Sequence, residues 1–354
     1  RWMIGGPKGD DESRLAGAFF LGAPLPVMGK LFALAEVNGE IRLVVINSAS
    51  GTLEWAQQLA HVDSRTILKD SRRRLAGATP SFAEGVMVCP TAAGAVVAVD
   101  ITNRSLLWGF QYYRPPQNRR NRIFINRYQN TNREKDAQWA DSSATIANGK
   151  VIITPFETNK VYCLDLLSGK KLWEKTRGDN LYLACIHGDN AVFVGKSGIS
   201  AVKLADGKDG WSKKLRFPLN GLPSGRGFYT GSHYFVGTTK GEVLKIDLNV
   251  GKIDHKIKTG RVLGNLVCHG DELISHNVDR ISSFYQIEPL RRKVQVELQK
   301  NPKDGYALTL RGQLELHDGE KTKALATLRA AHKLVPEEDE TKQLLVKTLL
   351  AALA

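Results

Sequence analysis

A short pattern that recurs five times constrains the fold of this chain more than any other feature. A run of alternating apolar residues ends at an aspartate-like position, and a large ring follows eight residues later. The five pairs are Asn47 with Trp55, Asp100 with Trp108, Asp165 with Trp173, Lys203 with Trp211, and Asp247 with His255. A glycine lies four residues before the ring in four copies, at Gly51, Gly169, Gly207 and Gly251, and the second copy has Arg104 there. The rings are 53, 65, 38 and 44 residues apart, so the pattern predicts similar units arranged around an axis.

Each copy predicts about four short antiparallel strands. Alternation before the aspartate predicts a strand with one buried face. The Asp-x-x-Ser-Gly turn then supplies a side-chain acceptor and a glycine for a positive φ. In the third copy, residues 144–146 and 151–153 flank the turn Asn148-Gly149 and predict two further strands. Four-stranded sheets around an axis are the blades of a β-propeller, with a typical length of ~40 to 45 residues. A ring on the outer strand fills the space between diverging blades.

We therefore expect an all-β propeller over residues 1–285 and a small α-helical extension over 286–354. The expected blade units are residues 19–55, 77–108, 142–173, 182–211, 222–255 and 263–285. Either the ring closes with six or seven blades, or the chain is part of a seven- or eight-bladed ring. The chain starts at Arg1 without a signal-peptide segment, which indicates a fragment or a processed product. No apolar run reaches the ~18 residues of a membrane-spanning helix.

After Tyr285 the apolar period changes from two to 3.6, which predicts helices. Residues 305–338 match the 34-residue tetratricopeptide repeat at Leu308, Gly312, Gly319, Ala324, Leu328, Ala331 and Pro336. The match departs at Arg311 and Glu315, where that family has apolar or aromatic residues. Residues 287–300 and 340–353 predict flanking helices. One repeat cannot bury its own face, so we expect it to pack on the propeller, on a further C-terminal segment or on a partner.

The intact repeat ending carries a family resemblance. The run from Asp165 through Ser168-Gly169 to Trp173 resembles the repeat of the pyrroloquinoline-quinone-like β-propellers. That superfamily includes quinoprotein alcohol dehydrogenases and the non-catalytic β-propeller lipoprotein of the outer-membrane protein assembly machinery. The resemblance covers residues 19–285, and the layout is similar to that of quinoprotein-like repeat proteins of planctomycete-type bacteria. It implies a periplasmic or other extracytoplasmic location and says little about activity, because fold does not fix function.

The formal net charge of +14 is concentrated in two insertions between blades. Residues 61–74 hold five basic and two acidic residues, and residues 110–135 hold seven basic and one acidic. The second insertion interleaves basic and aromatic side chains, which can bind phosphate and stack on planar groups. The candidate residues for an anionic partner are Arg114, Arg119, Arg120, Arg122, Arg127, Tyr112 and Tyr113. The pattern favours a solvated loop first, an anionic lipid, polymer or protein second, and nucleic acid last.

Catalytic patterns are sparse, and we expect no catalytic residues, no metal and no cofactor. His187 and His269 lie in equivalent His-Gly-Asp turns, which indicates a structural role. The cysteines lie singly in strands of four units, at Cys89, Cys163, Cys185 and Cys268. The resemblance implies that a quinone-dependent alcohol dehydrogenase would have adjacent cysteines and calcium ligands, and neither motif can be mapped here.

One polar cluster is expected at the central funnel, where propeller ligands bind. Arg226 lies between two glycines at the entry to the fifth unit, and similar entries occur in the third and sixth. The candidate ligand-binding residues are Ser224, Arg226, Trp139, Asp141 and Asn265. The alternative, which we favour, is that Arg226 pairs with an acid such as Asp141 in a contact between blades.

The sequence thus predicts a non-catalytic binding or assembly scaffold that engages a protein or an anionic partner outside the cytoplasm. The first alternative is a quinone-dependent or carbohydrate-acting enzyme that uses the funnel, and the second is a nucleic-acid binder that uses the basic insertion. Converging acid, base or metal ligands at the funnel would favour the enzyme, and a strong salt dependence on DNA would favour the nucleic-acid binder.

Overall fold

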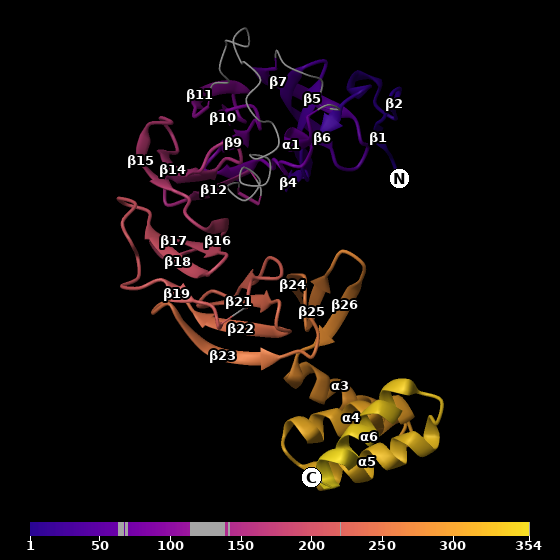
Figure 1. The fold of residues 1–354 in the computed structure, drawn as a ribbon. Coiled ribbons are helices and arrows are strands. Elements are labelled where there is room, and N and C mark those ends of the chain that lie inside the picture. Colours follow the sequence, from indigo (N-terminus) through magenta and orange to yellow (C-terminus); the bar gives the residue numbers. More distant parts are fainter. Residues whose placement is uncertain (63–66, 68–69, 114–138, 141, 220, 354) are drawn as a thin grey trace, which may run out of the picture. The chain divides into compact units, whose positions relative to one another are not determined.

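The structure is a computed structural model that describes residues 1–354 except 63–66, 68–69, 114–138, 141, 220 and 354 (Figure 1). The described residues divide into two compact units, Arg1–Val262 and Leu263–Ala354. Each unit is considered by itself below. No helix in the described ranges is long and apolar enough to cross a membrane.

The described residues of the first unit form a two-stranded sheet of β1 (Ile4–Gly5) and β2 (Gly9–Asp10) and five larger antiparallel sheets, each built from strands that follow one another along the chain. The first sheet consists of β3 (Phe19–Phe20), β5 (Lys30–Val37), β6 (Glu40–Asn47) and β7 (Leu53–His61), and β4 (Leu25–Val27) also pairs with β5. The second consists of β8 (Ser81–Ala83), β9 (Val86–Pro90), β10 (Ala95–Asp100) and β11 (Ser105–Gln111). The third consists of β12 (Ser143–Ala147), β13 (Lys150–Thr154), β14 (Lys160–Asp165) and β15 (Lys171–Thr176). The fourth consists of β16 (Asn180–His187), β17 (Asn190–Gly195), β18 (Gly198–Lys203) and β19 (Leu215–Arg216), and the fifth of β20 (Phe228–Tyr229), β21 (His233–Thr238), β22 (Glu242–Asp247) and β23 (Lys252–Lys258).

The second unit begins with a three-stranded sheet of β24 (Asn265–His269), β25 (Glu272–His276) and β26 (Ile281–Tyr285). The helices α3 (Ile287–Lys300), α4 (Gly305–His317), α5 (Lys321–Leu334) and α6 (Asp339–Leu353) follow it. The predicted class, β-propeller blades followed by a helical extension, is confirmed. The domain boundary expected at residue 285 stays a prediction.

The aspartate-like residue of each copy organises the turn between the last two strands of its sheet. Asp165 Oδ1 accepts hydrogen bonds from the backbone N–H (2.8 Å) and the hydroxyl (2.6 Å) of Ser168. Gly169 takes φ +67° and donates its N–H to the Asp165 carbonyl at 3.0 Å. The hydrogen bonds from Ser168 lower the pKa of Asp165 below its ordinary range, so the carboxylate stays charged at neutral pH. The turn chemistry read from the sequence therefore forms as expected.

The ring of each copy docks on the corresponding turn of the next copy. The indole N–H of Trp108 donates to the Leu166 carbonyl (2.8 Å) and that of Trp173 to the Leu204 carbonyl (3.0 Å). A Cβ added to Gly169 would lie 2.5 Å from the Trp108 ring, so only glycine leaves room for the indole there. We call each such contact a Trp–Gly joint. The joints pair Trp2 with Gly51, Trp108 with Gly169, Trp173 with Gly207, and Trp211 with Gly251.

The second and fifth copies show what happens when a joint lacks one of its parts. Arg104 occupies the glycine position at φ +53°, and its guanidinium lies 5.7 Å from the centre of the Trp55 ring, within cation–π range. His255 takes the ring position of the fifth copy, and its side chain is 72% exposed. The array of joints therefore ends in the last sheet of the first unit.

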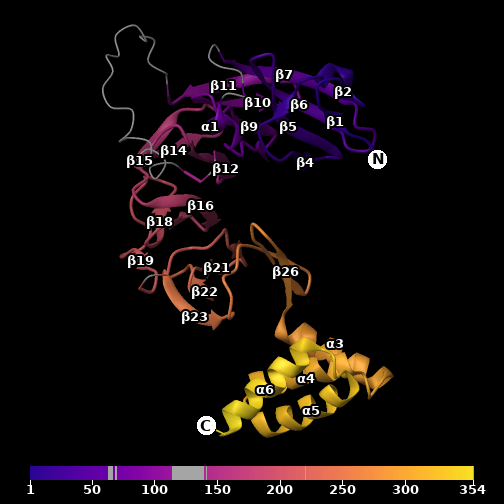
Figure 2. The ribbon, with the colours of Figure 1, turned by 45° about the vertical axis from the view of Figure 1, so that its right-hand side comes forward.

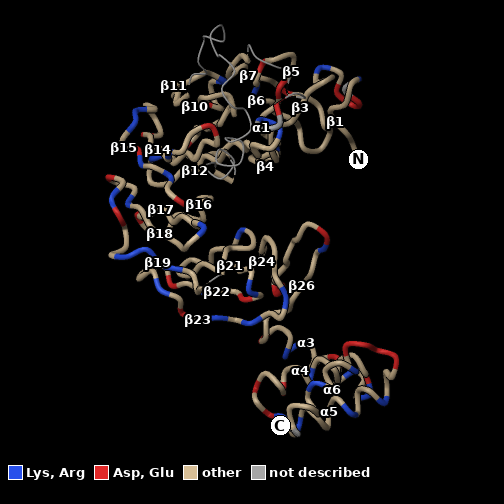
Figure 3. Tube along the Cα trace, viewed as in Figure 1, with Lys and Arg blue, Asp and Glu red and all other residues tan. Residues whose placement is uncertain are grey.

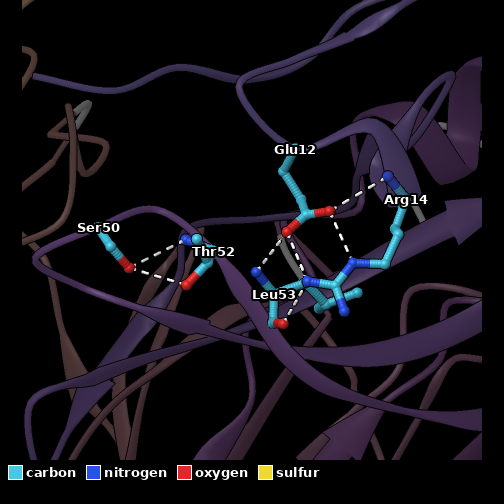
Figure 4. Close-up of polar contacts among 5 residues, drawn as sticks. All are labelled: Glu12, Arg14, Ser50, Thr52 and Leu53. Atoms are coloured by element: carbon cyan, nitrogen blue, oxygen red, sulfur yellow. Dashed lines mark hydrogen bonds and ion pairs between the residues drawn. The ribbon is translucent and has the colours of Figure 1, made fainter.

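The N-terminal segment is fixed to the first sheet by a second set of contacts (Figure 4). This segment holds β1 (Ile4–Gly5), β2 (Gly9–Asp10) and the short 3-10 helix η1 (Ser13–Leu15). The buried carboxylate of Glu12 accepts hydrogen bonds from the Leu53 N–H (2.7 Å) and from Arg14 Nε (2.8 Å) and Nη2 (2.7 Å). Arg14 also donates to the Leu53 carbonyl at 2.6 Å. These hydrogen bonds from Arg14 lower the pKa of Glu12 to about 2.

The four helices of the second unit repeat with a period of 34 residues (Figure 2). Helices α3 and α5 start at residues 287 and 321, and α4 and α6 start at residues 305 and 339. Gly312 lies against Leu328, because a Cβ added at Gly312 would be 2.7 Å from two of its side-chain atoms. The tetratricopeptide match is thus doubled, although the sequence alone indicates one repeat with two flanking helices.

Candidate functional site

Both basic insertions leave the first unit at the same end of its sheets. In an antiparallel sheet, the turn between the second and third strands and the connection from the fourth strand to the next sheet lie at one end. We call this end the B–C face. Among the described residues it is formed by the turns 38–39, 91–94, 155–159, 196–197 and 239–241 and by the described parts of the connections, residues 62, 67, 70–80, 112–113, 139–140, 142, 177–179, 217–219 and 221–227.

A buried ion pair lies at the B–C face below the first insertion. Arg73, in the short helix α1 (Ser71–Arg74), and Glu36, near the end of β5, are each only 4% exposed. Arg73 Nη1 lies 3.4 Å from Glu36 Oε2, and Arg73 Nε lies 3.4 Å from Asp70 Oδ2. Burial raises the pKa of Glu36, and the charge of Arg73 opposes that shift. Arg73 is one of the five basic residues that make residues 61–74 positively charged in the sequence. In the structure its charge is paired with Glu36 and Asp70.

A partly buried acid, Glu157, anchors the start of the longer insertion. Glu157 Oε1 accepts a hydrogen bond from the Gly94 N–H (2.9 Å), and the Tyr112 hydroxyl donates to the carboxylate at 3.3 Å. The Tyr112 ring stacks on Tyr162 with centroids 6.1 Å apart. Burial raises the pKa of Glu157 and that of Tyr112, and the Glu157 charge raises the pKa of Tyr112 further. We call Gly94, Tyr112 and Glu157 the insertion anchor.

The insertion anchor joins two neighbouring sheets and fixes the direction in which the chain leaves. Tyr112 and Tyr113 both donate their N–H groups to the Gly94 carbonyl, at 3.0 and 3.1 Å. A Cβ at Gly94 would lie 2.4 Å from the Tyr113 carbonyl oxygen, so a glycine is needed for this approach. The predicted partner residue Tyr113 is 40% exposed, whereas Tyr112 belongs to the anchor. Arg114, Arg119, Arg120, Arg122 and Arg127 lie outside the described residues.

The described basic residues also gather on an outer strand. Figure 3 shows basic residues along β23, where Lys252, Lys256 and Lys258 are exposed. They lie within a strand, so a search for basic insertions passes over them. Lys256 and Lys258 lie on one face of β23, and a register shift between Ile253 and His255 places Lys252 on the other.

Arg226 lies on a neighbouring ring. Its guanidinium carbon is 4.4 Å from the centre of the Tyr182 ring, and the Tyr182 hydroxyl donates to the Gly225 carbonyl at 3.0 Å. The Ser224 N–H donates to the Gly237 carbonyl (3.0 Å), and Pro223 forms an antiparallel bridge with Thr238. Residues 222–229 therefore lie along β21, on the inner side of the fifth sheet. The structure therefore places Gly225 and Arg226 against Tyr182 of β16, and Ser224 against β21. Such a stacked guanidinium presents its N–H edge for a carboxylate or a carbonyl group.

The other predicted funnel residues are placed differently. Trp139 is 3% exposed, donates its indole N–H to the Lys160 carbonyl (2.9 Å) and packs against Phe193 at 5.8 Å. Asn265 begins β24 in the second unit, and Asp141 lies outside the described residues. Ligand contact by this set stays a prediction, as does the pairing of Arg226 with Asp141.

The surroundings of three cysteines and of His187 do not activate these side chains for chemistry. Burial raises the pKa of Cys163 to about 12 and that of Cys185 to about 12, and it raises the pKa of Cys89 as well, which keeps these thiols protonated. His187 contacts the Tyr229 hydroxyl and the Asn249 side-chain oxygen, each at 3.1 Å, so both ring nitrogens have partners. Among the described residues, no group of three or more His, Cys, Asp or Glu side chains is arranged to hold a metal ion.

Glu36 and Glu157 are the residues that reading the sequence missed. Glu36 interrupts the apolar run of residues 34–37, and a lone acid at that point of a buried strand is a signal for a buried partner. Glu157 lies in a short turn without any such contrast, and only the fold brings it to Tyr112.

Comparison with known proteins identifies relatives of the whole repeat array. The profile of the family described as outer membrane protein assembly factor BamB matches residues 7–184 and 195–324. The crystal structure of BamB from Moraxella catarrhalis is similar at 15% identity and a TM-score of 0.48, covering 77% of this chain and 69% of that one. The computationally designed Ika8 protein gives 12% identity and a TM-score of 0.50, covering 77% and 72%. The latter likeness concerns the fold alone, and no curated relative matches the chain.

Proposed function

Because this chain belongs to the family of the outer membrane protein assembly factor BamB, we propose that it is a non-catalytic scaffold that binds a protein partner outside the cytoplasm. The family match supports an assembly role, and the pyrroloquinoline-quinone-like repeat is the device that builds the scaffold. The contact surface that we propose is the B–C face of the first unit.

The observation that carries this proposal is the insertion anchor. A carboxylate that accepts hydrogen bonds from Gly94 and Tyr112 fixes the root of a long insertion on two neighbouring sheets. The Arg73–Glu36 pair holds the first insertion at the same face. Ordering both roots before binding reduces the entropy lost on association, which favours a recognition surface.

The basic character of both insertions favours a partner with acidic residues at the contact. Seven basic residues lie between positions 110 and 135, against one acidic residue. Complementary charge accelerates encounter and selects the partner more than it adds affinity. We therefore propose an acidic surface on a component of the outer-membrane assembly machinery as the partner.

Site-specific photocrosslinking in cells tests the proposed face. A benzophenone amino acid would be placed at Tyr113 or Lys240 on the B–C face, and at Asn103 or Leu167 in turns at the opposite end of the sheets. We expect adducts with an outer-membrane assembly protein from the first pair alone, identified by mass spectrometry. Adducts from the opposite end alone, or no adducts from either end, would contradict the proposal.

A further inference from the structure

A groove in the second unit has features that the scaffold role does not use. It lies between α3 and α4 and has a volume of about 440 Å³, within the ~300 to 1,000 Å³ typical of ligand sites. Val294, Leu298 and Leu314 give it an apolar lining, and charged side chains of both helices complete it. We call it the α3–α4 groove.

One side chain of the groove has a buried atom without a partner. Glu315 is 8% exposed, and its Oε1 accepts a hydrogen bond from Arg311 Nε at 2.9 Å. Its Oε2 is buried and has no hydrogen-bond partner among the described residues. A buried carboxylate oxygen in this state destabilises the fold, because it loses water without gaining a donor.

The other charged side chains that line the groove have ion-pair partners. Arg291 Nη1 donates to Asp318 Oδ2 at 2.8 Å, and Glu320 accepts from Lys323 at 2.8 Å. Each of the three lining acids thus has one basic partner, Arg311 for Glu315, Arg291 for Asp318 and Lys323 for Glu320, and among the described residues of the groove only the buried Glu315 Oε2 is left without a donor. The unmet group is thus an acceptor, and the groove favours a cation.

The internal repeat shows that packing does not require this acid. At a period of 34 residues, Arg311 corresponds to Leu345 and Glu315 corresponds to Leu349. The second copy therefore has two partly buried leucines at the positions where the first has an ion pair. Replacing a buried ion pair by apolar residues is commonly neutral or stabilising, so the charges in the first copy call for another explanation.

We propose that the α3–α4 groove binds an alkylammonium group, with its nitrogen on Glu315 Oε2 and its methylene stem against Val294, Leu298 and Leu314. An ammonium is a compact charge with three donors, which suits a single confined oxygen better than a planar guanidinium does. An aliphatic stem that ends in a charge matches an apolar lining with one acidic end. A lysine side chain of a protein and a free diamine share this chemistry.

Arg311 would compete with the bound cation for the Glu315 carboxylate, because it occupies that carboxylate when no ligand is bound. Its side chain is 54% exposed, so it can turn towards solvent and release the Glu315 carboxylate. Removing Arg311 should therefore strengthen binding, whereas removing the charge of Glu315 should abolish it. A role limited to packing predicts no such opposite effects.

Titration of the full chain tests the proposal, with the methyl NMR signals of Val294, Leu298 and Leu314 as the readout. The probes are Nα-acetyl-lysine methylamide, 1,5-diaminopentane and, as an uncharged control, Nα-acetyl-norleucine methylamide. We expect saturable shifts with at least one amine and none with norleucine. Glu315→Gln should weaken binding at least about tenfold, as the loss of a charge-assisted hydrogen bond implies, and Arg311→Leu should tighten it.

Two further variants keep the test decisive if single changes disturb folding. The double variant R311L/E315L takes the residues of the second copy, and we expect it to fold with an unchanged or higher melting temperature and no binding. Glu337→Gln removes an acid whose side chain is 96% exposed and should bind as the parent does. Tighter binding of the lysine amide assigns a protein ligand, and tighter binding of the diamine assigns a free one. Equal shifts with norleucine, no shift with either amine, or amine binding that survives in R311L/E315L would overturn the proposal.

Discussion

At the scale of single residues, each Trp–Gly joint pairs a tryptophan with the turn glycine of the copy that follows it along the chain. The indole supplies area and one hydrogen bond, and the glycine supplies the space and the positive φ. Trp173 and Trp211 are 8% and 9% exposed, so the joints are part of the core. All six tryptophans lie in the first unit, and their fluorescence therefore reports its unfolding separately from the second unit.

Truncating Trp173 should weaken the first unit strongly. We expect Trp173→Ala to lower the free energy of unfolding by roughly 3 to 5 kcal/mol, since it opens a cavity and removes the donor to Leu204. Denaturant titration followed by tryptophan fluorescence measures the change. His255→Ala is the matched control, because His255 has the same repeat position but is exposed, and it should have little effect. Equal effects of the two changes would contradict the joint.

A methyl group at Gly169 should separate backbone strain from contact with the indole. Gly169→Ala places Cβ 2.5 Å from the Trp108 ring at φ +67°, whereas Gly149→Ala meets no atom within 4 Å at φ +66°. We expect each to lose about 1 kcal/mol from strain, and Gly169→Ala to lose a further 1 to 3 kcal/mol from overpacking. Adding Trp108→Ala should remove that further loss. Similar unfolding curves for the two glycine variants would show that the turn can shift to accommodate the methyl group, and would contradict the predicted overpacking against Trp108.

The hydrogen bonds of Glu12 with Arg14 and Leu53, which we call the Glu12 clamp, should make the free energy of unfolding depend on pH in the acid range. Hydrogen bonds from Arg14 lower the pKa of Glu12 from its ordinary 4.5 to about 2, so the contribution is complete above pH 4.5 and is lost as pH falls towards 2. We expect Glu12→Gln to cost roughly 1 to 3 kcal/mol at pH 7, allowing for the exposed Arg14, and progressively less below pH 4.5. Unfolding at several pH values checks this, with Glu337→Gln as an exposed control. A difference that does not change with pH would rule out the ionic clamp.

At the scale of elements, the connection 62–80 combines a basic sequence with a buried ion pair. Arg73 and Glu36 lose water together, so removing either one leaves the other as a buried charge. The contribution of such a pair is measured by a double-mutant cycle, because single changes also report the cost of the remaining charge.

Breaking that pair should be harmful, and replacing both members should be tolerated. Arg73→Met should cost about 3 to 5 kcal/mol, and Arg73→Met with Glu36→Leu should recover most of it. Unfolding followed by tryptophan fluorescence gives both values. If the double variant is as unstable as the single one, the charges serve the packing of α1 in another way.

The sequence predicts these elements unevenly, for physical reasons. Period-two alternation, the Asp165 turn and the tryptophans are local signals, and they indicate the blades before any contact is known. The doubled 34-residue period is hidden because Arg311 and Glu315 differ from Leu345 and Leu349. Of the candidate site, Tyr112 and Arg226 are visible as residue types, but Glu157 reaches Tyr112 only through the pairing of neighbouring sheets. Contacts between distant segments depend on that tertiary arrangement, which composition and spacing do not encode.

At the scale of the whole molecule, the net charge of +14 should be expressed mainly through the insertion 110–135. Replacing Arg119, Arg120 and Arg122 with Ser should weaken retention on anionic vesicles and acidic polymers with little change in melting temperature, because exposed charges contribute little to stability. Retention should also fall between about 50 and 200 mM salt, since screening acts over ~10 Å at 0.1 M. A set of Lys252, Lys256 and Lys258 changed to Ser is the control for loss of charge alone. If retention depends neither on salt nor on either set of substitutions, the insertion is a solvated loop without a role in anion binding. If the protein is retained on duplex DNA alone, a nucleic-acid partner is favoured.

The direction of the Trp–Gly joints has a consequence for how such a chain can change over generations. Three joints are completed by a tryptophan from one copy and a glycine from the copy after it, and the joint at Gly51 takes Trp2 from the N-terminal segment. An in-frame duplication or deletion of the third or fourth copy, which holds both a glycine and a tryptophan, therefore leaves the new boundary with both parts, so a gene could gain or lose such a blade in a single event. A point change is more visible, as Arg104 shows by meeting Trp55 through its charge instead of leaving room for it. The number of copies can therefore change without breaking a joint, whereas a substitution at either residue of a joint acts directly on the boundary between two copies.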